Sequence, residues 1–150
     1  MQRWIAAGLI AMMAMGGGLV LAYRLYSQSR PSPVWVPLRI NPDVSDKQRE
    51  ESVRQLKDKL SESARLAAIC KDLGLASKWH LGSDEAAARE LGQRLFVKAG
   101  EMDGPIGKVP SINVGVHGKR KEKPLSEAIV MRMMDDVCNI LGIKPPPKKN

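Results

Sequence analysis

The 150-residue chain is poor in aromatic, cysteine and histidine residues. It holds one Phe, two Tyr, three Trp, two Cys and two His. Two cysteines can form one disulfide in an oxidising compartment, and they do not identify the compartment of this protein. Cys70 and Cys138 fall on apolar helix faces, where they form either one disulfide or two buried thiols. His80 and His117 are isolated in sequence, and this spacing does not suit zinc, so no metal is expected.

Motifs that carry catalysis are also missing. The sequence contains no Walker loop, no HExxH and no GxSxG. Asp135 and Asp136 are adjacent, and adjacent residues on a helix point in different directions, which argues against a metal pair. We therefore expect a protein that is not an enzyme and needs no cofactor. An enzyme built on Asp136 or His117 is the weaker alternative.

Positive charge is in excess, with a net charge of +8 spread along the chain. Its sharpest cluster is KRKEK, in which Lys119, Arg120, Lys121 and Lys123 are candidate contacts for an anionic surface such as phosphates, acidic sugars or lipid headgroups. The alternative is a solvated connecting loop. No aromatic platform accompanies these charges, so no nucleic-acid partner is expected and stacked sugar binding is poorly supported.

One long hydrophobic run is present. Trp4 to Tyr23 spans twenty residues without a charge, and at about 1.5 Å per residue such a helix can cross a hydrocarbon core of about 30 Å. Trp4, Tyr23 and Arg24 are the expected interface anchors at its ends. A cleaved secretory signal, with small residues at Val20-Leu21-Ala22, is the alternative. We favour an uncleaved anchor because the run is longer than a usual signal core.

The chain divides into four expected regions. These are a transmembrane anchor (1–27), a linker (28–33), an α+β domain (34–143) and a disordered Pro- and Lys-rich tail (144–150). Arg3 precedes the hydrophobic run and Arg24 follows it, so the positive-inside rule does not choose the orientation. Membrane lipid is the expected partner.

Within the domain, a strand is expected at 34–40, interrupted by Pro37, which favours an edge position. Ser45 is expected to begin a long helix through a capping box with Gln48, and Gly74 to end it. A shorter helix should follow Ser83. The apolar stripe of the long helix is expected to run through Val53, Leu56, Leu60, Ala64, Ala67 and Ile69.

Two strands are expected next, at 94–100 and 111–118, separated by the segment 101–110. A final amphipathic helix should run from Leu125 to Gly142. Trp79 is expected to pack over the end of the long helix. The order of elements predicts an α+β fold with helices packed on one face of a short three-stranded sheet.

Three phrases of the sequence resemble the chain-length determinant family, the polysaccharide co-polymerases of lipopolysaccharide and exopolysaccharide assembly. The first phrase lies around Gly74 and Trp79, the second at the passage from the short helix into a strand, and the third in the later strand. The matching residues are Leu73, Gly74, Leu75, Lys78, Trp79, Leu91, Arg94, Leu95, Val97, Ile112, Val114 and Val116.

The resemblance implies a protein of the bacterial inner membrane whose domain is periplasmic. Family members have no catalytic residues and act by assembly with copies of themselves and by contact with the polysaccharide polymerase machinery. The long helical extension and second membrane helix of the family are not seen in this chain, which implies a minimal relative. The alternative function is a membrane-tethered basic module that binds anionic lipid or an acidic polymer.

Overall fold

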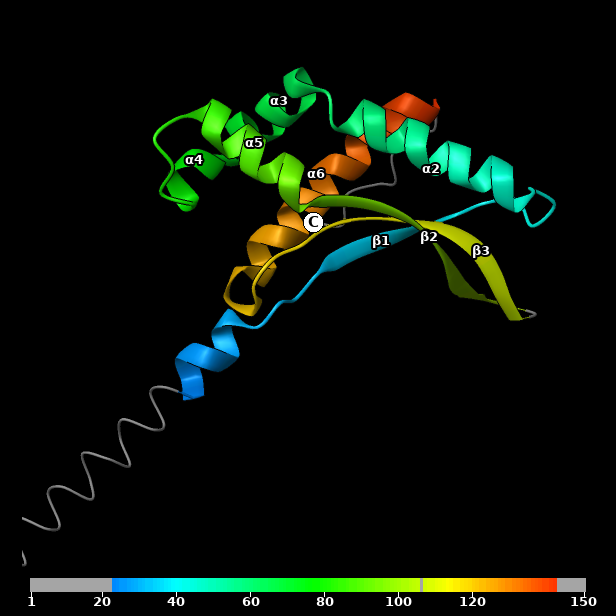
Figure 1. Ribbon diagram of the computed structural model, residues 1–150, viewed down its shortest axis with the longest axis horizontal. Helices are drawn as coiled ribbons and strands as arrows, with labels where there is room; N and C mark the ends of the chain where they lie inside the picture. The colour runs from blue at the N-terminus through cyan, green and yellow to red at the C-terminus, as the bar shows by residue number, and fades with distance from the viewer. Residues whose placement is uncertain (1–22, 106, 143–150) are drawn as a thin grey trace, which may run out of the picture.

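The computed structural model describes residues 23–105 and 107–142 (Figure 1). Residues 23–29 are helical and lead into a three-stranded sheet covered by helices. This architecture confirms the α+β class and the three strands expected from the sequence. The elements are β1 (Val34–Arg39), α2 (Asp46–Leu60), α3 (Ser63–Leu73), α4 (Leu75–Lys78), α5 (Asp84–Arg94), β2 (Leu95–Gly104), β3 (Gly107–Val116), the 3-10 turn η1 (Arg120–Glu122) and α6 (Lys123–Leu141).

The expected membrane anchor falls almost wholly outside the described residues. Trp4 lies outside them, while Tyr23 and Arg24 are exposed where the described chain begins. Within the two described ranges, no helix is both long enough and apolar enough to cross a bilayer. The anchor stays a prediction from the sequence. The expected tail at 144–150 also lies outside the described residues.

Strand β3 is the centre of the sheet and pairs antiparallel with both β1 and β2. In its register, Val114 lies opposite Val36 of β1 and Val97 of β2. Figure 1 shows the helices on one side of the sheet and the other side bare. Because side chains alternate along a strand, one set of residues faces the helices and the other set faces outward.

Local capping signals begin and end the helices where the sequence predicts. The Ser45 hydroxyl accepts a hydrogen bond from the Gln48 N–H at 3.3 Å, and the Gln48 side chain accepts from the Ser45 N–H at 3.2 Å. This reciprocal pair satisfies two amide groups that the first turn leaves unbonded. The Ser83 hydroxyl caps α5 by accepting a hydrogen bond from the Ala86 N–H, without a reciprocal side-chain bond. Gly74 ends α3 with a φ of +60°.

The single long helix expected from Ser45 to Gly74 is wrong. The chain forms two helices, α2 and α3, with a break at Ser61 and Glu62. Glu62 has a ψ of 128°, which is extended backbone and interrupts the helical hydrogen bonds. The break lets α3 turn away from the direction of α2, as Figure 1 shows.

The break also changes which residues of α3 face the core. Leu66 and Cys70 are buried together with Ile69, whereas Ala64 and Ala67 are exposed. The expected stripe through the two alanines is therefore wrong, although its Leu56, Leu60 and Ile69 are buried. The new helical phase places the larger Leu66 side chain in the core, and burying a larger apolar surface gains more free energy.

Strands β2 and β3 are longer than expected. The sequence assigned 101–110 to a connection, but β2 continues to Gly104 and β3 begins at Gly107. The two strands extend beyond β1 as a two-stranded ribbon, in which Lys108 Nζ lies 3.6 Å from Glu101 Oε2. Neither face of this ribbon is buried deeply, so it lacks the alternation of apolar residues that marks a strand in sequence.

The hydrophobic core lies between the helices and the covered face of the sheet. Helix α6 contacts both β1 and β3, while α3 packs on α5 and α6. Trp79 is half-buried and packs against this core, as expected. The largest fully buried side chains are Leu60, Ile69, Leu75, Leu91, Ile129, Met133, Val114, Val116, Val130 and Val137.

Gly115 sits at the tightest point of the open face. A Cβ atom there would collide with the Val34 carbonyl oxygen and would lie 2.7 Å from Trp35 Cβ and 2.8 Å from Phe96 Cζ. The backbone of β1 and the Phe96 ring therefore occupy the space that any other side chain would need.

We expect Gly115→Ala to lower the free energy of unfolding by about 1–3 kcal/mol, the usual cost of overpacking. Urea denaturation of the full-length chain in detergent micelles, followed by Trp fluorescence, measures the change. Gly82→Ala is the matched control, because a Cβ there meets nothing within 4 Å. The control should be neutral or slightly stabilising. Equal midpoints for the two variants would contradict the packing described here.

Candidate functional site

The basic cluster predicted from the sequence forms a tight turn between β3 and α6. Arg120, Lys121 and Glu122 form η1, Lys119 precedes it and Lys123 begins α6. The four basic side chains are exposed. Helix α6 begins two residues earlier than expected, because Pro124 is tolerated in a first turn, where its missing N–H would be unbonded.

The acidic residue of this turn points inward. Glu122 Oε2 accepts a hydrogen bond from Arg94 Nη1 at 3.0 Å and from the Lys119 N–H at 3.4 Å. Lys123 Nζ lies 3.8 Å from Glu127, but both side chains are more than half exposed, and such pairs are weak. The outward surface of the turn is therefore positive.

Main-chain contacts hold this turn beside the segment that follows the N-terminal helical residues. The Ser32 N–H donates to the Gly118 carbonyl at 2.8 Å, and the Arg120 N–H donates to the Arg30 carbonyl at 3.0 Å. Pro31 and Lys119 form an isolated antiparallel bridge. Figure 1 shows the start of α6 next to the helix of residues 23–29. We call this surface the basic collar; it consists of Arg24, Arg30, Lys119, Arg120, Lys121 and Lys123.

The basic collar can attract an anionic surface. Its residues are exposed to solvent, so salt screens their charges over about 8–10 Å. Each Lys or Arg near an anionic membrane contributes about 1 kcal/mol of binding. Within the described ranges, no group of three or more His, Cys, Asp and Glu side chains could hold a metal ion.

Arg94 connects the collar to the core. Its guanidinium lies 4.6 Å from the ring centroid of Trp79, over the ring face, and its Nε donates to Glu90 at 2.7 Å. Together with the bond to Glu122, these contacts join α5, the connector after α4 and η1. The base of the collar is thereby fixed to the helical layer.

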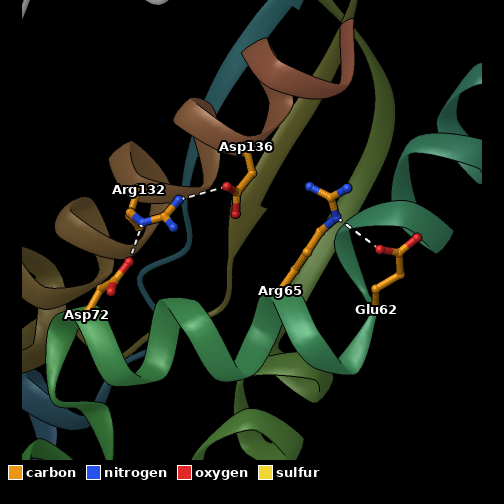
Figure 2. Close-up of polar contacts among 5 residues, drawn as sticks. All are labelled: Glu62, Arg65, Asp72, Arg132 and Asp136. Carbon is orange, nitrogen blue, oxygen red and sulfur yellow. Dashed lines mark hydrogen bonds and ion pairs between the residues drawn. The ribbon is translucent and has the colours of Figure 1, made fainter.

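The adjacent acids Asp135 and Asp136 do not form a paired site. Asp136 is buried and accepts a hydrogen bond from Arg132 Nη1 at 2.8 Å, while Arg132 Nε donates to Asp72 of α3 at 2.9 Å (Figure 2). These bonds raise the pKa of the Arg132 guanidinium further above its usual range. The arrangement ties α6 to α3 and gives Asp136 a structural contact.

The open face of the sheet gathers residues that the sequence analysis did not bring together. Trp35, Gly115 and Phe96 lie side by side across the three strands. The His117 ring centroid lies 4.6 Å from that of Phe96, and Lys98 Nζ lies 5.5 Å from the Phe96 centroid. Because the chain has few aromatic residues, the sequence predicted no aromatic platform. The strand register nevertheless places Trp35 and Phe96 on one face together with Lys98.

A shallow groove lies on the helical side, between α3 and α5. Its volume is about 550 Å³. The exposed Ala64 and Ala67 contribute to it, which follows from the changed phase of α3. The lining residues are Ser61, Ser63, Ala64, Leu66, Ala67, Glu85, Ala88, Arg89 and Gly92. The lining is thus a mixture of small or apolar side chains with two serines, Glu85 and Arg89.

Both cysteines are buried free thiols. Of the two alternatives left open by the sequence, one disulfide or two buried thiols, the structure therefore contains the two thiols. Burial, with a smaller contribution from the negative charge of Asp84, raises the pKa of the Cys70 thiol to about 11. A thiol with such a pKa is protonated at neutral pH and is a poor nucleophile. Cys70 therefore acts as a small apolar residue of the core.

Comparison with known proteins gives no relative: no protein-family model, no curated protein and no solved structure matches this chain. The resemblance to the chain-length determinant family accordingly stays a prediction from the sequence.

The Cys70 thiol predicts a loss of stability at high pH. Below pH 9.0 the thiol is protonated in both the folded and unfolded states; between 9.0 and about 11 only the folded state keeps the proton. The free energy of unfolding should therefore fall by up to about 1.4 kcal/mol per pH unit over that range.

Urea unfolding at a series of pH values, compared with Cys70→Ala, isolates this contribution, because other titrating groups cancel in the difference. Cys138→Ala is the control and should keep the slope. Identical slopes for the native chain and Cys70→Ala would show that Cys70 does not hold its proton in the folded state.

Proposed function

We propose that this protein is a membrane-tethered, non-enzymatic docking domain whose basic collar rests on anionic lipid headgroups. The observation that carries the proposal is the set of main-chain contacts that holds the basic turn beside residues 30–32. These residues follow the uncharged run of Trp4 to Tyr23 by only a few positions. If the run spans the bilayer, the collar lies at the membrane surface.

The energetics suit a domain that is already tethered. Each collar residue contributes about 1 kcal/mol near an anionic surface. A few such contacts are weak for a dissolved protein. A tether converts the contact into an intramolecular event with a high effective concentration, so a weak contact is sufficient to set how the domain sits on the bilayer.

The collar predicts lipid-dependent protection of the turn. The full-length chain is placed in nanodiscs of phosphatidylcholine, with and without added phosphatidylglycerol, and hydrogen exchange is measured at residues 117–124. We expect stronger protection in the anionic discs, lost as salt is raised, because salt screens exposed charges. Changing Lys119, Arg120 and Lys121 together to Gln should remove the difference.

The matched control changes Lys47, Lys57 and Lys59 to Gln. These residues belong to α2 and are exposed, and Figure 1 shows α2 away from the helix of residues 23–29. The control removes the same charge and should keep the lipid-dependent protection. Equal protection in neutral and anionic discs, or equal loss in both variants, would refute headgroup binding by the collar.

We propose a role in cell-envelope polysaccharide assembly or chain-length control as a second candidate function. The order of strand, helices, two strands and helix after a hydrophobic segment supports it, because this is the order that the sequence resemblance implies. In this function the domain is periplasmic and acts by contact with the polymerase machinery or with copies of itself. No chemical step is assigned to the domain.

Deletion of the gene in its host should change the length or the amount of surface glycan, as seen on a polyacrylamide gel of extracted polysaccharide. Complementation with the Lys119, Arg120 and Lys121 variant should restore the pattern, since this function depends on assembly and not on those charges. An unchanged glycan profile in the deletion strain would remove this candidate.

A further inference from the structure

The open face of the sheet is a surface with its own chemistry, separate from the basic collar. Helices cover the opposite face, and Figure 1 shows no element of the described chain over this one. Strand register places its residues in three rows. These rows are Trp35–Gly115–Phe96, Pro37–Asn113–Lys98 and Arg39–Ser111–Gly100.

The first row presents one free aromatic side chain. The Phe96 ring extends over Gly115 and is flanked by His117 and Lys98, so its surface is largely engaged within the protein. Trp35, on the other edge of the row, is 50% exposed. Of the large hydrophobic side chains on the described part of this face, Trp35 is the one that is exposed.

The remaining rows are polar and positive. Arg39 and Lys98 are exposed, and Asn113 lies between β1 and β2 on the central strand. Glu101 and Asp103 of β2 occupy the alternate positions and therefore point to the other side of the sheet. Within the described strands, the open face thus carries two cations and no carboxylate.

We propose that the open face of the sheet binds an acidic polysaccharide chain. The Trp35 indole stacks on the C–H face of one sugar ring, while Arg39 and Lys98 form charge-assisted hydrogen bonds with carboxylates of neighbouring sugars. The Asn113 side chain lies between them and can hydrogen-bond sugar hydroxyls.

The charge of the face disfavours a second copy of this protein as the occupant. A two-fold contact would bring together two copies of a face that carries Arg39 and Lys98 and no carboxylate, and juxtaposed like charges cost several kcal/mol. A bilayer is also disfavoured, because a lipid-inserting face needs several exposed apolar side chains and this face offers Trp35 alone.

Single-stranded nucleic acid fits less well than an acidic sugar chain. Proteins that bind it stack successive bases on several aromatic side chains along a charged groove. Among the described residues, this face has one exposed aromatic ring. An acidic sugar chain offers apolar ring faces for the Trp35 indole and hydroxyls for the Asn113 amide. Its carboxylates match the two cations, Arg39 and Lys98.

The experiment uses the full-length chain in phosphatidylcholine nanodiscs, titrated with oligogalacturonate and, separately, with an uncharged maltooligosaccharide. Binding is read by isothermal titration calorimetry and by the change in Trp emission. We expect oligogalacturonate to bind and the uncharged sugar not to bind detectably. Trp35→Ala, and Arg39→Gln combined with Lys98→Gln, should each weaken binding about tenfold or more.

Lys57→Gln combined with Lys59→Gln is the control for the charge change and should leave the affinity unaltered. Circular dichroism tests whether each variant is folded. The Arg39 and Lys98 variant changes only exposed residues and should therefore fold, so binding can still be tested if Trp35→Ala unfolds. The collar variant at Lys119, Arg120 and Lys121 should bind oligogalacturonate as before. This arm separates a failure of the glycan proposal from a failure of headgroup binding.

Four results would overturn the proposal. The first is equal binding of the charged and uncharged sugars, and the second is an affinity that the Trp35 and Arg39–Lys98 variants leave unchanged. The third is tighter binding of oligo-dT or poly-glutamate through the same residues, and the fourth is a shift in Trp35 emission when phosphatidylglycerol is added to the discs without any sugar. A dimer that Trp35→Ala dissociates, seen by analytical ultracentrifugation, would instead assign the face to a second copy.

Discussion

The pairing of β3 with both of its neighbours is the constraint on which the rest of this structure depends. Because β3 is central, the alternation of its side chains determines which residues lie on each face of the sheet. Ile112, Val114 and Val116 are buried beneath the helices, and Gly115 and Asn113 face outward. A shift of one residue in this register would exchange the two faces. Gly115 resists such a shift, since the next residue on either side carries a side chain that would meet β1 and Phe96.

The same pairing produces both functional surfaces. Strands β1 and β3 are antiparallel, so the start of β1 lies beside the end of β3. The segment before β1 and the turn after β3 therefore meet, and this meeting forms the basic collar. The open face begins at the same end, next to His117, and continues along the strands to Arg39. A domain anchored at residues 1–27 would in this way present positive charge to the lipid and the open face of the sheet along its side.

The helical layer holds this sheet through a few specific contacts in addition to apolar burial. Arg132 joins α6 to α3 through Asp136 and Asp72, and Arg94 joins α5 to η1 through Glu122. The pairs of Arg132 with Asp136 and of Arg94 with Glu122 are partly buried, so solvent screens them less than it screens surface ion pairs. The pair with Arg132 also accounts for Asp136, which the sequence offered as a candidate catalytic acid.

The sequence by itself determined the features that depend on neighbours in the chain. The helix starts at Ser45 and Ser83, the stop at Gly74, the alternation of β3 and the α+β class follow from capping bonds, backbone freedom and the period of apolar residues. Of the collar, Lys119, Arg120, Lys121 and Lys123 were also identified from their clustering. Only the tertiary structure decided that β3 is central, that the helix breaks at Glu62, that the collar meets residues 30–32 and that Trp35 shares a face with Phe96 and Lys98. The physical reason is that the pairing of β1 with β3 joins residues 72–82 positions apart in the chain. The free energies of such contacts depend on the packing of the whole domain and not on local pattern.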